Sequence, residues 1–220
     1  AVVIKSREEG ATWFLVGRAM HTWLFVPNSV YGLGSRKEEL VDKRGDPDTL
    51  FAKFRFALER LPDWMIPKGF SYREHDKNLT IINPANAAVV KGEAGDNIGR
   101  GGRSTEYALD EADFIPRLET VARSVIENAN CVILISTVAG PGTHLAAMEQ
   151  VHPVFVMHWK DNPDKNYSEV IDGKIIYPWY EKKKLAYAAD PVGLAREIDA
   201  NRNAASPGAL IPNEWIKAAQ

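Results

Sequence analysis

The sequence predicts an α/β fold with a mainly parallel β-sheet flanked by helices, and three segments carry this prediction. The β-branched run AVVIKS at residues 1–6 is followed by a short polar segment and then by an apolar-rich stretch. CVILIST at residues 131–137 is an apolar strand of the kind that is buried on both faces in parallel sheets. A helical pattern at residues 116–129 directly precedes it. Strands that alternate with helices in this way favour a parallel sheet.

The first half of the chain is expected to continue this alternation. A helix is expected at residues 13–20 and a second strand at 23–26. Residues 35–61 are rich in charge and are followed by Pro62, which predicts an amphipathic helix that ends there. The apolar residues at helical spacing in it are Phe51, Phe54, Leu58 and Leu61. Two β-type runs within residues 71–90, LTIINP and NAAVV, are expected to be neighbouring strands.

The second half contains a glycine-rich loop, GDNIGRGGRS, and then the expected strand TEYALDEADF. A further strand is expected at 153–158, a looser region at 160–190 and a short helix at 194–201, with another helix beginning at Pro212. We therefore expect a core domain over residues 1–160 and a smaller C-terminal subdomain over 161–220.

Composition excludes several classes of protein. Among 220 residues, 27 Lys and Arg stand against 29 Asp and Glu, so the chain lacks the basic excess of a passive nucleic-acid coat and any DNA contact must be local. Cys131 is the single cysteine, which excludes an internal disulfide and favours a buried core thiol. No apolar run approaches the roughly 20 residues that span a bilayer, and no signal peptide is evident, so an intracellular protein is expected.

The segment IKSREEGATW lies where a phosphate-binding loop belongs, between the first strand and the first helix. Gly10 and Thr12 match the last glycine and the hydroxyl of the pattern GxxxxGK[ST], whereas Ala11 occupies the lysine position. Lys5, at the start of the loop, is the candidate for the missing cation. A structural turn between a strand and a helix has the same pattern, so the interpretation needs support from other motifs.

Two later motifs supply that support. In EYALDEADF, apolar residues lead to Asp110 and Glu111 at a strand end, where an Asp can order Mg²⁺ and a Glu can activate the attacking water. These acids could instead cap the following helix. One strand later, ILIST ends in Ser136 and Thr137, a polar pair that can sense the γ-phosphate. The order and spacing of the three motifs favour an NTPase.

The segments KSREEGAT, GSRKEELVDK, GRGGRSTEYALDEADF, ILISTVAG and HW…P…YPWYEKKK…AREIDAN together resemble the ATPase half of the large terminase subunit of tailed bacteriophages. The resemblance covers essentially the whole chain. It implies a RecA-like P-loop NTPase fold and an ATPase motor that hydrolyses ATP with Mg²⁺ and drives double-stranded DNA into a prohead.

The resemblance also implies roles for individual residues. Asp110 and Thr12 are expected to hold the metal, Glu111 to act as the base, and Ser136 and Thr137 to couple hydrolysis to movement. The expected nucleotide-binding loop consists of Lys5, Ser6, Arg7, Glu8, Glu9, Gly10, Ala11 and Thr12, in which Arg7 is also a catalytic candidate.

Arg100 in the glycine-rich loop resembles the arginine that terminases insert into a neighbouring subunit's site. Such an arginine stabilises charge on the transferring phosphoryl group and is worth about 10³-fold or more in rate. Arg103 is the second choice for this role. The alternative is a solvated loop whose arginines contact DNA phosphates or nothing.

The implied partners are double-stranded DNA, the portal protein, the small terminase subunit and further copies of the chain, typically in a pentameric ring. The implied location is the cytoplasm of an infected or lysogenic bacterial host. The family's adenine-contacting segment precedes the first strand, and its nuclease domain is expected after residue 220, so neither can be placed here. Glu8 stands where many relatives have Gln. An acid beside the ATP phosphates is unfavourable unless its side chain points away from them.

Two rival functions remain at this point. A helicase of superfamily 2 type shares the three motifs but needs a second RecA-like domain. A nucleotide- or DNA-binding module without hydrolysis is favoured if Ala11 and Glu8 have disabled the loop. Among weaker candidates, Trp64, Trp159 and Trp179 are expected to be core aromatics, and Lys182–Lys184 to form a solvated face with phosphate contact as the alternative.

Overall fold

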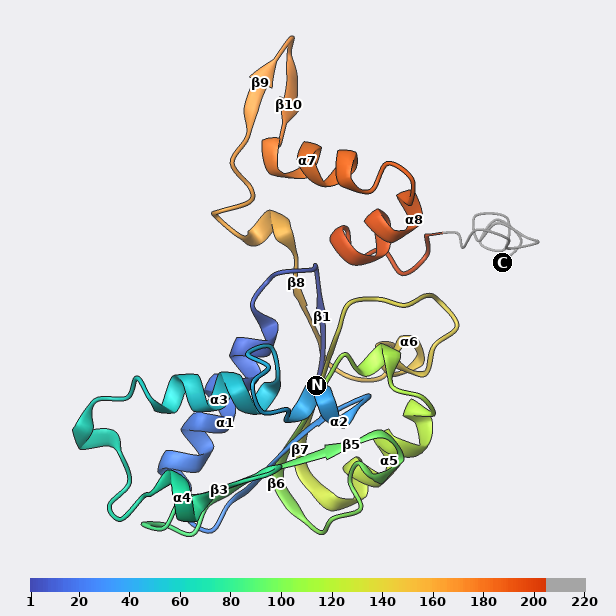
Figure 1. The fold of residues 1–220 in the computed structure, drawn as a ribbon. Helices are drawn as coiled ribbons and strands as arrows, with labels where there is room; N and C mark the ends of the chain where they lie inside the picture. The colour runs from blue at the N-terminus through green and yellow to red at the C-terminus, as the bar shows by residue number, and fades with distance from the viewer. Residues whose placement is uncertain (205–220) are drawn as a thin grey trace. The chain divides into compact units, whose positions relative to one another are not determined.

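The computed structural model describes residues 1–204 and comprises two compact units (Figure 1). The first unit contains Ala1 and Gly10–Ile135, and the second contains Val2–Glu9 together with the chain from Ser136 onward. The expected domain boundary near residue 160 stays a prediction. The helix expected at Pro212 lies outside the described residues.

The first unit is built on a mostly parallel sheet. Its strands in spatial order are β3 (Asp76–Lys77), β4 (Thr80–Ile82), β5 (Val89–Ala94), β2 (Val30–Ser35), β6 (Ser104–Asp110) and β7 (Ala129–Ser136). The four strands from β5 to β7 are parallel, with Leu33 of β2 opposite Gly92 of β5 and Ala108 of β6. Strands β3 and β4 add antiparallel pairs at one edge. The two expected strands of residues 71–90 are therefore confirmed as the neighbours β4 and β5.

Helices cover both faces of this sheet. They are α1 (Ala11–Phe25), α2 (Glu38–Val41), α3 (Leu50–Leu58), α4 (Tyr72–His75) and α5 (Leu118–Asn128), with single 3₁₀ turns η1 (Asp63–Met65), η2 (Gly95–Asn97) and η3 (Ala112–Phe114). The connections β2 to β5 and β6 to β7 run in opposite directions along the sheet. Right-handed crossovers then place α3 and α5 on opposite faces, and Figure 1 shows α1 and α3 on one side of the strands and α5 on the other.

Aromatic packing joins α1 to α3 in the core of the first unit. Trp23 is fully buried, with its ring centroid 5.7 Å from that of Phe54 and 5.6 Å from that of Phe70, both edge to face. Its indole N–H donates to the carbonyl of Ile81 at 3.2 Å, so the polar group of this large side chain is satisfied within the core.

The second unit pairs the first strand with a late one. Strand β1 (Val2–Lys5) is parallel to β8 (Val154–Met157), with Lys5 opposite Met157. The other elements are α6 (His144–Met148), η4 (Trp159–Asp161), the hairpin strands β9 (Glu169–Ile171) and β10 (Lys174–Ile176), α7 (Pro178–Ala186), α8 (Pro191–Gly193) and the π-helical turn η5 (Leu194–Ile198). Trp159 is buried and stacks on Tyr180 at 4.8 Å between ring centroids, which confirms it as a core aromatic.

Two predicted elements in the first half are wrong in detail. Residues 23–26 do not form a strand, because α1 continues through Phe25 and its buried Trp23 faces α3. Residues 35–61 form two helices rather than one, because Thr49 caps a new helix by accepting a hydrogen bond from the N–H of Ala52.

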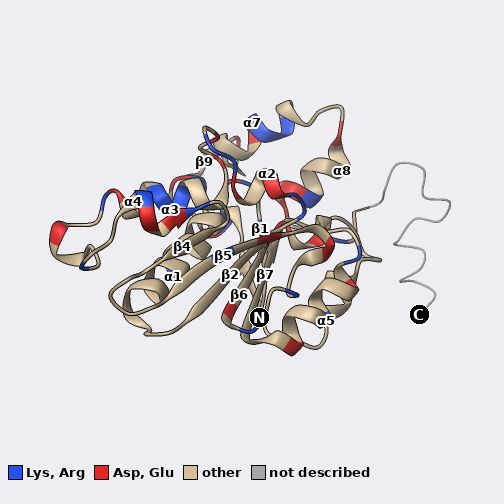
Figure 2. Ribbon diagram, turned by 60° about the horizontal axis from the view of Figure 1, so that its bottom comes forward, with Lys and Arg blue, Asp and Glu red and all other residues tan. Residues whose placement is uncertain are grey.

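Three surface features also differ from expectation. Cys131 is exposed, because the first half of β7 is only partly covered. Trp64 is 81% exposed and is not a core aromatic. The region 160–190, expected to be loose, contains the β9–β10 hairpin and α7, whose basic residues are visible in Figure 2. None of the helices in residues 1–204 is long and apolar enough to cross a bilayer.

Candidate nucleotide-binding site

The start of α1 has the geometry of an anion-binding site. Gly10 adopts a φ of 73°, in the left-handed region that favours glycine, and Ala11 then begins a helix of 15 residues. The first turn of α1 contains no acidic residue. Since the first N–H groups of a helix lack intrahelical acceptors, this end attracts anions such as phosphate.

A hydroxyl and a carboxylate meet beside this helix end. The Oγ1 of Thr12 donates a hydrogen bond to Oδ2 of Asp110 at 2.9 Å. Asp110 ends β6 and is 7% exposed, and its Oδ1 accepts from the backbone N–H of Glu111 at 3.1 Å. Oxygen ligands of these two types suit Mg²⁺, so the pair fits the metal role expected of Thr12 and Asp110.

Glu111 lies at a sharp change of chain direction. Its φ is 54°, a left-handed conformation that residues other than glycine seldom adopt. The conformation ends β6 and begins the 3₁₀ turn η3. Glu111 therefore stands at the carboxyl end of a parallel strand, the edge at which α/β sheets bind ligands.

A partly buried ion pair holds α1 against β6. The Nε and Nη2 groups of Arg18 donate to the Glu106 carboxylate, at 2.8 and 2.9 Å, and the hydroxyl of Thr22 donates to the same carboxylate at 3.1 Å. Glu106 is 7% exposed. Bidentate geometry of this kind is strong and directional, so it sets how α1, with Thr12, lies along β6, with Asp110.

The glycine-rich loop is anchored at Gly99. Its N–H donates to Oε2 of Glu93 at 2.5 Å, and its carbonyl accepts from Ser124 and Asn128, each at 3.0 Å. A Cβ at position 99 would meet the backbone nitrogen of Val125 at 2.9 Å, and φ is 76°, so glycine is required there. Anchoring on both sides fixes the residue that precedes Arg100.

The same carboxylate binds a buried tyrosine. The hydroxyl of Tyr107 donates to Glu93 at 2.8 Å, and Lys91 lies 3.1 Å from the other oxygen. Burial, and next the negative charge of Glu93, raise the pKa of Tyr107 far above its usual range. Arg100 and Arg103 follow this anchor as exposed side chains, and exposure is what a residue directed at a partner requires.

The second unit contains the first half of the predicted loop. Ser6 is fully buried, and its hydroxyl donates to the carbonyl of Ile198 at 2.6 Å while accepting from the N–H of Trp159 at 3.1 Å. The guanidinium of Arg7 pairs with the Glu197 carboxylate, and the backbone N–H of Arg7 donates to the Glu197 carbonyl at 2.7 Å. These side chains therefore hold the loop to the segment around η5.

The two acids of the loop are neutralised by lysines. Lys183 lies 3.0 Å from the Glu8 carboxylate, and this hydrogen bond is the main reason that the pKa of Glu8 lies below its usual value. Lys165 lies 2.5 Å from Oε1 of Glu9, whose Oε2 accepts from Asn162 at 2.9 Å. Glu8 and Glu9 thus have cationic partners, which offset the repulsion expected between an acid at position 8 and the phosphates of ATP.

The remaining predicted residues are buried in the second unit. Lys5 ends β1 and is 8% exposed, and Ser136 and Thr137 are 0% and 5% exposed. The structure brings together Gly10, Ala11, Thr12, Asp110 and Glu111 in the first unit, with Arg100 in a separate loop, and Lys5 to Glu9 with Ser136 and Thr137 in the second. Lys165, Glu197 and Glu93 were missed, since nothing in the sequence links a charge to its partner, and Lys183, expected on a solvated face, pairs with Glu8 instead.

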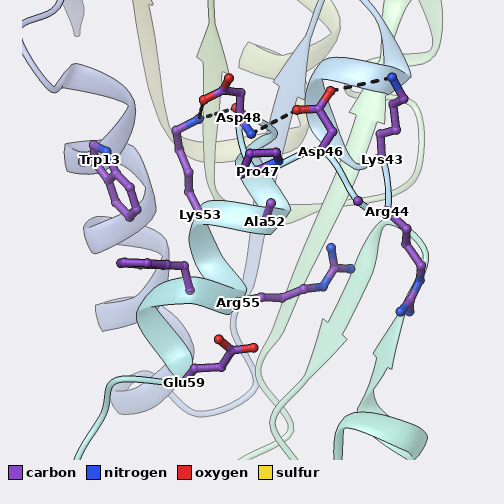
Figure 3. Close-up of a pocket in the computed structure, with 12 residues that line it drawn as sticks. Trp13, Lys43, Arg44, Asp46, Pro47, Asp48, Ala52, Lys53, Arg55 and Glu59 are labelled. Atoms are coloured by element: carbon purple, nitrogen blue, oxygen red, sulfur yellow. Dashed lines mark hydrogen bonds and ion pairs between the residues drawn. The ribbon is translucent and has the colours of Figure 1, made fainter.

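A pocket of about 660 Å³ lies beside Trp13, one residue after Thr12 (Figure 3). The Trp13 ring meets Phe56 edge on, at 5.6 Å between centroids. Two ion pairs line the pocket: Lys43 lies 3.7 Å from Asp46 in the loop before α3, and Lys53 of α3 lies 3.6 Å from Asp48. No sequence pattern indicated this pocket, because its walls come from separate helices.

No protein-family model and no curated protein matches this sequence. Among solved structures, the large terminase ATPase domain of Thermus phage P74-26 is similar over 91% of this chain and 87% of its own, with a TM-score of 0.59 and 18% identity. This chain has the fold of a large terminase ATPase domain. The large terminase of a second thermophilic bacteriophage, in complex with ADP, gives a TM-score of 0.63 and 14% identity, and its complex with ATP-gamma-S gives 0.61 and 13%.

The predicted RecA-like α/β fold is confirmed by these similarities. The match to the ADP-bound terminase covers 90% of this chain but only 47% of that protein, so this chain spans about half of its length. At 13–18% identity the similarity concerns the fold.

Proposed function

We propose that this chain is the ATPase motor of a viral terminase and hydrolyses ATP to drive double-stranded DNA into a prohead. The observation that carries the proposal is the hydrogen bond between Thr12 and Asp110 beside the Gly10 end of α1, within a terminase ATPase fold. In P-loop NTPases the hydroxyl of the loop and the acid at the end of a neighbouring strand hold Mg²⁺ together.

The residues then have separable roles in the reaction. The N–H groups at the start of α1 and Lys5 bind the phosphates, and Glu111 orients a water molecule for in-line attack on the γ-phosphorus. The bond from that phosphorus to the bridging oxygen breaks, which gives ADP and phosphate. Mg²⁺, held by Thr12 and Asp110, would neutralise charge on the phosphate oxygens. Ser136 and Thr137 respond to loss of the γ-phosphate.

Partners and location follow from the same proposal. The motor is inferred to work as a ring, typically of five copies, with the portal protein and the small terminase subunit, in the cytoplasm of an infected or lysogenic bacterium. A neighbour's Arg100 completes each site. The anchored Gly99 and the exposed Arg100 side chain support this last role.

Lys5→Ala tests the binding half of the proposal. Because Ala11 replaces the usual loop lysine, removing Lys5 is expected to weaken ATP binding by about 10–100-fold, the value of about 1.5–3 kcal/mol for a hydrogen bond to a charged group. Titration calorimetry with ATP-gamma-S and Mg²⁺ measures it, with the exposed Lys68→Ala as the matched control. Equal affinity of wild type and Lys5→Ala would show that Lys5 does not bind the phosphates. A wild type that binds no nucleotide would contradict the proposal.

Arg100→Ala tests the assembly of the site from two copies. In the motor assembled with portal and DNA, the variant is expected to lose about 10³-fold in turnover while its ATP affinity is retained. Mixing it with Glu111→Gln should restore turnover, because some junctions then join an intact Arg100 to an intact Glu111. Arg103→Ala is the matched control. If mixing restores nothing and Arg103→Ala is the inactive variant, Arg103 is the inserted arginine.

A further inference from the structure

Lys165 is a buried cation that contacts the phosphate loop from within the second unit. It is 8% exposed, and it lies in the turn that follows η4. Its Nζ donates to the carbonyl of Glu8 at 2.7 Å and to the Glu9 carboxylate at 2.5 Å, and lies 3.4 Å from the carbonyl of Arg7. An ammonium has three N–H donors, so these acceptors match its full capacity.

An aromatic ring also contacts Lys165. Its Nζ lies 4.9 Å from the centroid of Trp179, which packs against the buried Trp159 at 5.5 Å. A desolvated cation over an aromatic face is favourable. Lys165 therefore has a defined position relative to the aromatic cluster, and the loop carbonyls are held to that position.

Fixing these carbonyls fixes the direction of the loop N–H groups. A peptide unit is planar, with its C=O and N–H pointing in opposite directions. Since the carbonyls of Arg7 and Glu8 point toward Lys165, the N–H groups of Glu8 and Glu9 point away from it. Successive N–H groups turned to one side form the concave surface that binds anions.

We propose that Lys165 is a positioning residue that sets the conformation of the phosphate-binding loop, and so sets nucleotide affinity, without contacting the nucleotide. The inference rests on the proposed ATPase function. It assigns the turn that follows η4 a role in nucleotide binding that is exerted through main-chain carbonyls rather than through contacts to ATP.

Lys165→Met tests this role because it removes the charge and the donors but keeps most of the side-chain volume. The dissociation constant for ATP-gamma-S and the KM for ATP are expected to rise by about tenfold or more, as misplaced binding groups do. The value of kcat is expected to stay within about twofold, since Thr12, Asp110 and Glu111 are unchanged. The exposed Lys182→Met is the matched control. A Lys165→Met variant with wild-type affinity, or with reduced kcat and unchanged KM, would overturn the inference.

A second pair of variants separates loop positioning from neutralisation of Glu9. If Lys165 served only to neutralise that acid, Glu9→Gln combined with Lys165→Met would recover wild-type affinity. We expect the double variant to stay as weak as Lys165→Met alone. Recovery in the double variant overturns the proposal.

Urea unfolding of each variant without nucleotide is the control for correct folding. Should Lys165→Met fail to fold, Lys165→Arg replaces it, because the planar guanidinium keeps the charge but not the three-donor geometry. Lys165→Arg is then expected to lose about threefold or more in affinity, and wild-type affinity would overturn the inference. A wild type without nucleotide binding refutes the proposed function itself, whereas normal wild-type binding with unaffected variants refutes only the role of Lys165.

Discussion

Glu111→Gln is expected to bind ATP with wild-type affinity and to release phosphate about 10²–10⁴-fold more slowly, the range that one positioned acid or base contributes. The amide keeps the size of the side chain and its hydrogen-bonding oxygen but is not basic. The φ of 54° is a backbone property that Gln tolerates as well as Glu does. Binding without turnover would separate the chemical step from nucleotide recognition.

The measurement compares phosphate release and ATP-gamma-S affinity on the same samples of wild type and variant. Glu119→Gln is a suitable control, because this exposed residue lies in the first turn of α5 and pairs on the surface with Arg123. A Glu111→Gln chain with wild-type turnover would assign the general base elsewhere and leave Glu111 as a residue of the η3 turn.

The largest loss of stability is expected from Arg55→Met. Arg55 donates to Asp42 at 2.7 and 2.9 Å and to Asp76 at 2.8–3.0 Å, and both acids are more than 90% buried. Removing the guanidinium leaves two buried carboxylates without their cation, which costs about 3–5 kcal/mol. Urea unfolding measures this loss, with the exposed Arg73→Met of α4 as the control.

The loss should also depend on pH, with a defined sign. Burial raises the pKa of Asp42, but hydrogen bonds from Arg55 and from the N–H of Leu79 outweigh it, so the pKa in the folded state lies below the usual value of 3.8. The ion pair of Arg55 with Asp42 therefore stabilises the folded state at pH values above 3.8, and this contribution is lost as the pH falls through the pKa that Asp42 has in the folded state. In Arg55→Met the buried Asp42 carboxylate loses the hydrogen bonds that lower its pKa while burial still raises it, so the stability difference between the two chains should shrink on acidification.

Unfolding at pH 7 and near pH 4 tests this dependence. A difference in unfolding free energy that stays constant, or grows as pH falls, would mean that Arg55 stabilises the unit through the packing of its side chain rather than through its charge.

The sequence by itself determined the strands and motifs whose signals are local. An apolar run that ends in Asp110 and Glu111 specifies both a buried strand and the position of its acids, because a strand ends where polar groups must reach water or a ligand. Gly10 likewise specifies the left-handed residue at the start of α1. These signals need only a few neighbouring residues, so they can be read without the fold.

Local patterns were insufficient where packing decides the element. WLFV at residues 23–26 has the composition of a strand, yet these residues end α1 or follow it, because Trp23 is buried against α3 and Phe70. Cys131 lies in an apolar strand and is nevertheless exposed, because the cover of a strand comes from other segments.

The tertiary structure alone decided how the motifs are held. Lys165 contacts residues more than 150 positions earlier, Glu93 anchors Gly99 from the end of β5, and Arg55 joins two acids that lie 13 and 21 positions away. One charged residue in a sequence resembles any other, since its partner is chosen by chain topology and by the cost of burying a charge unpaired. The candidate residues of the site could therefore be named from the sequence, whereas the contacts that position them required the fold.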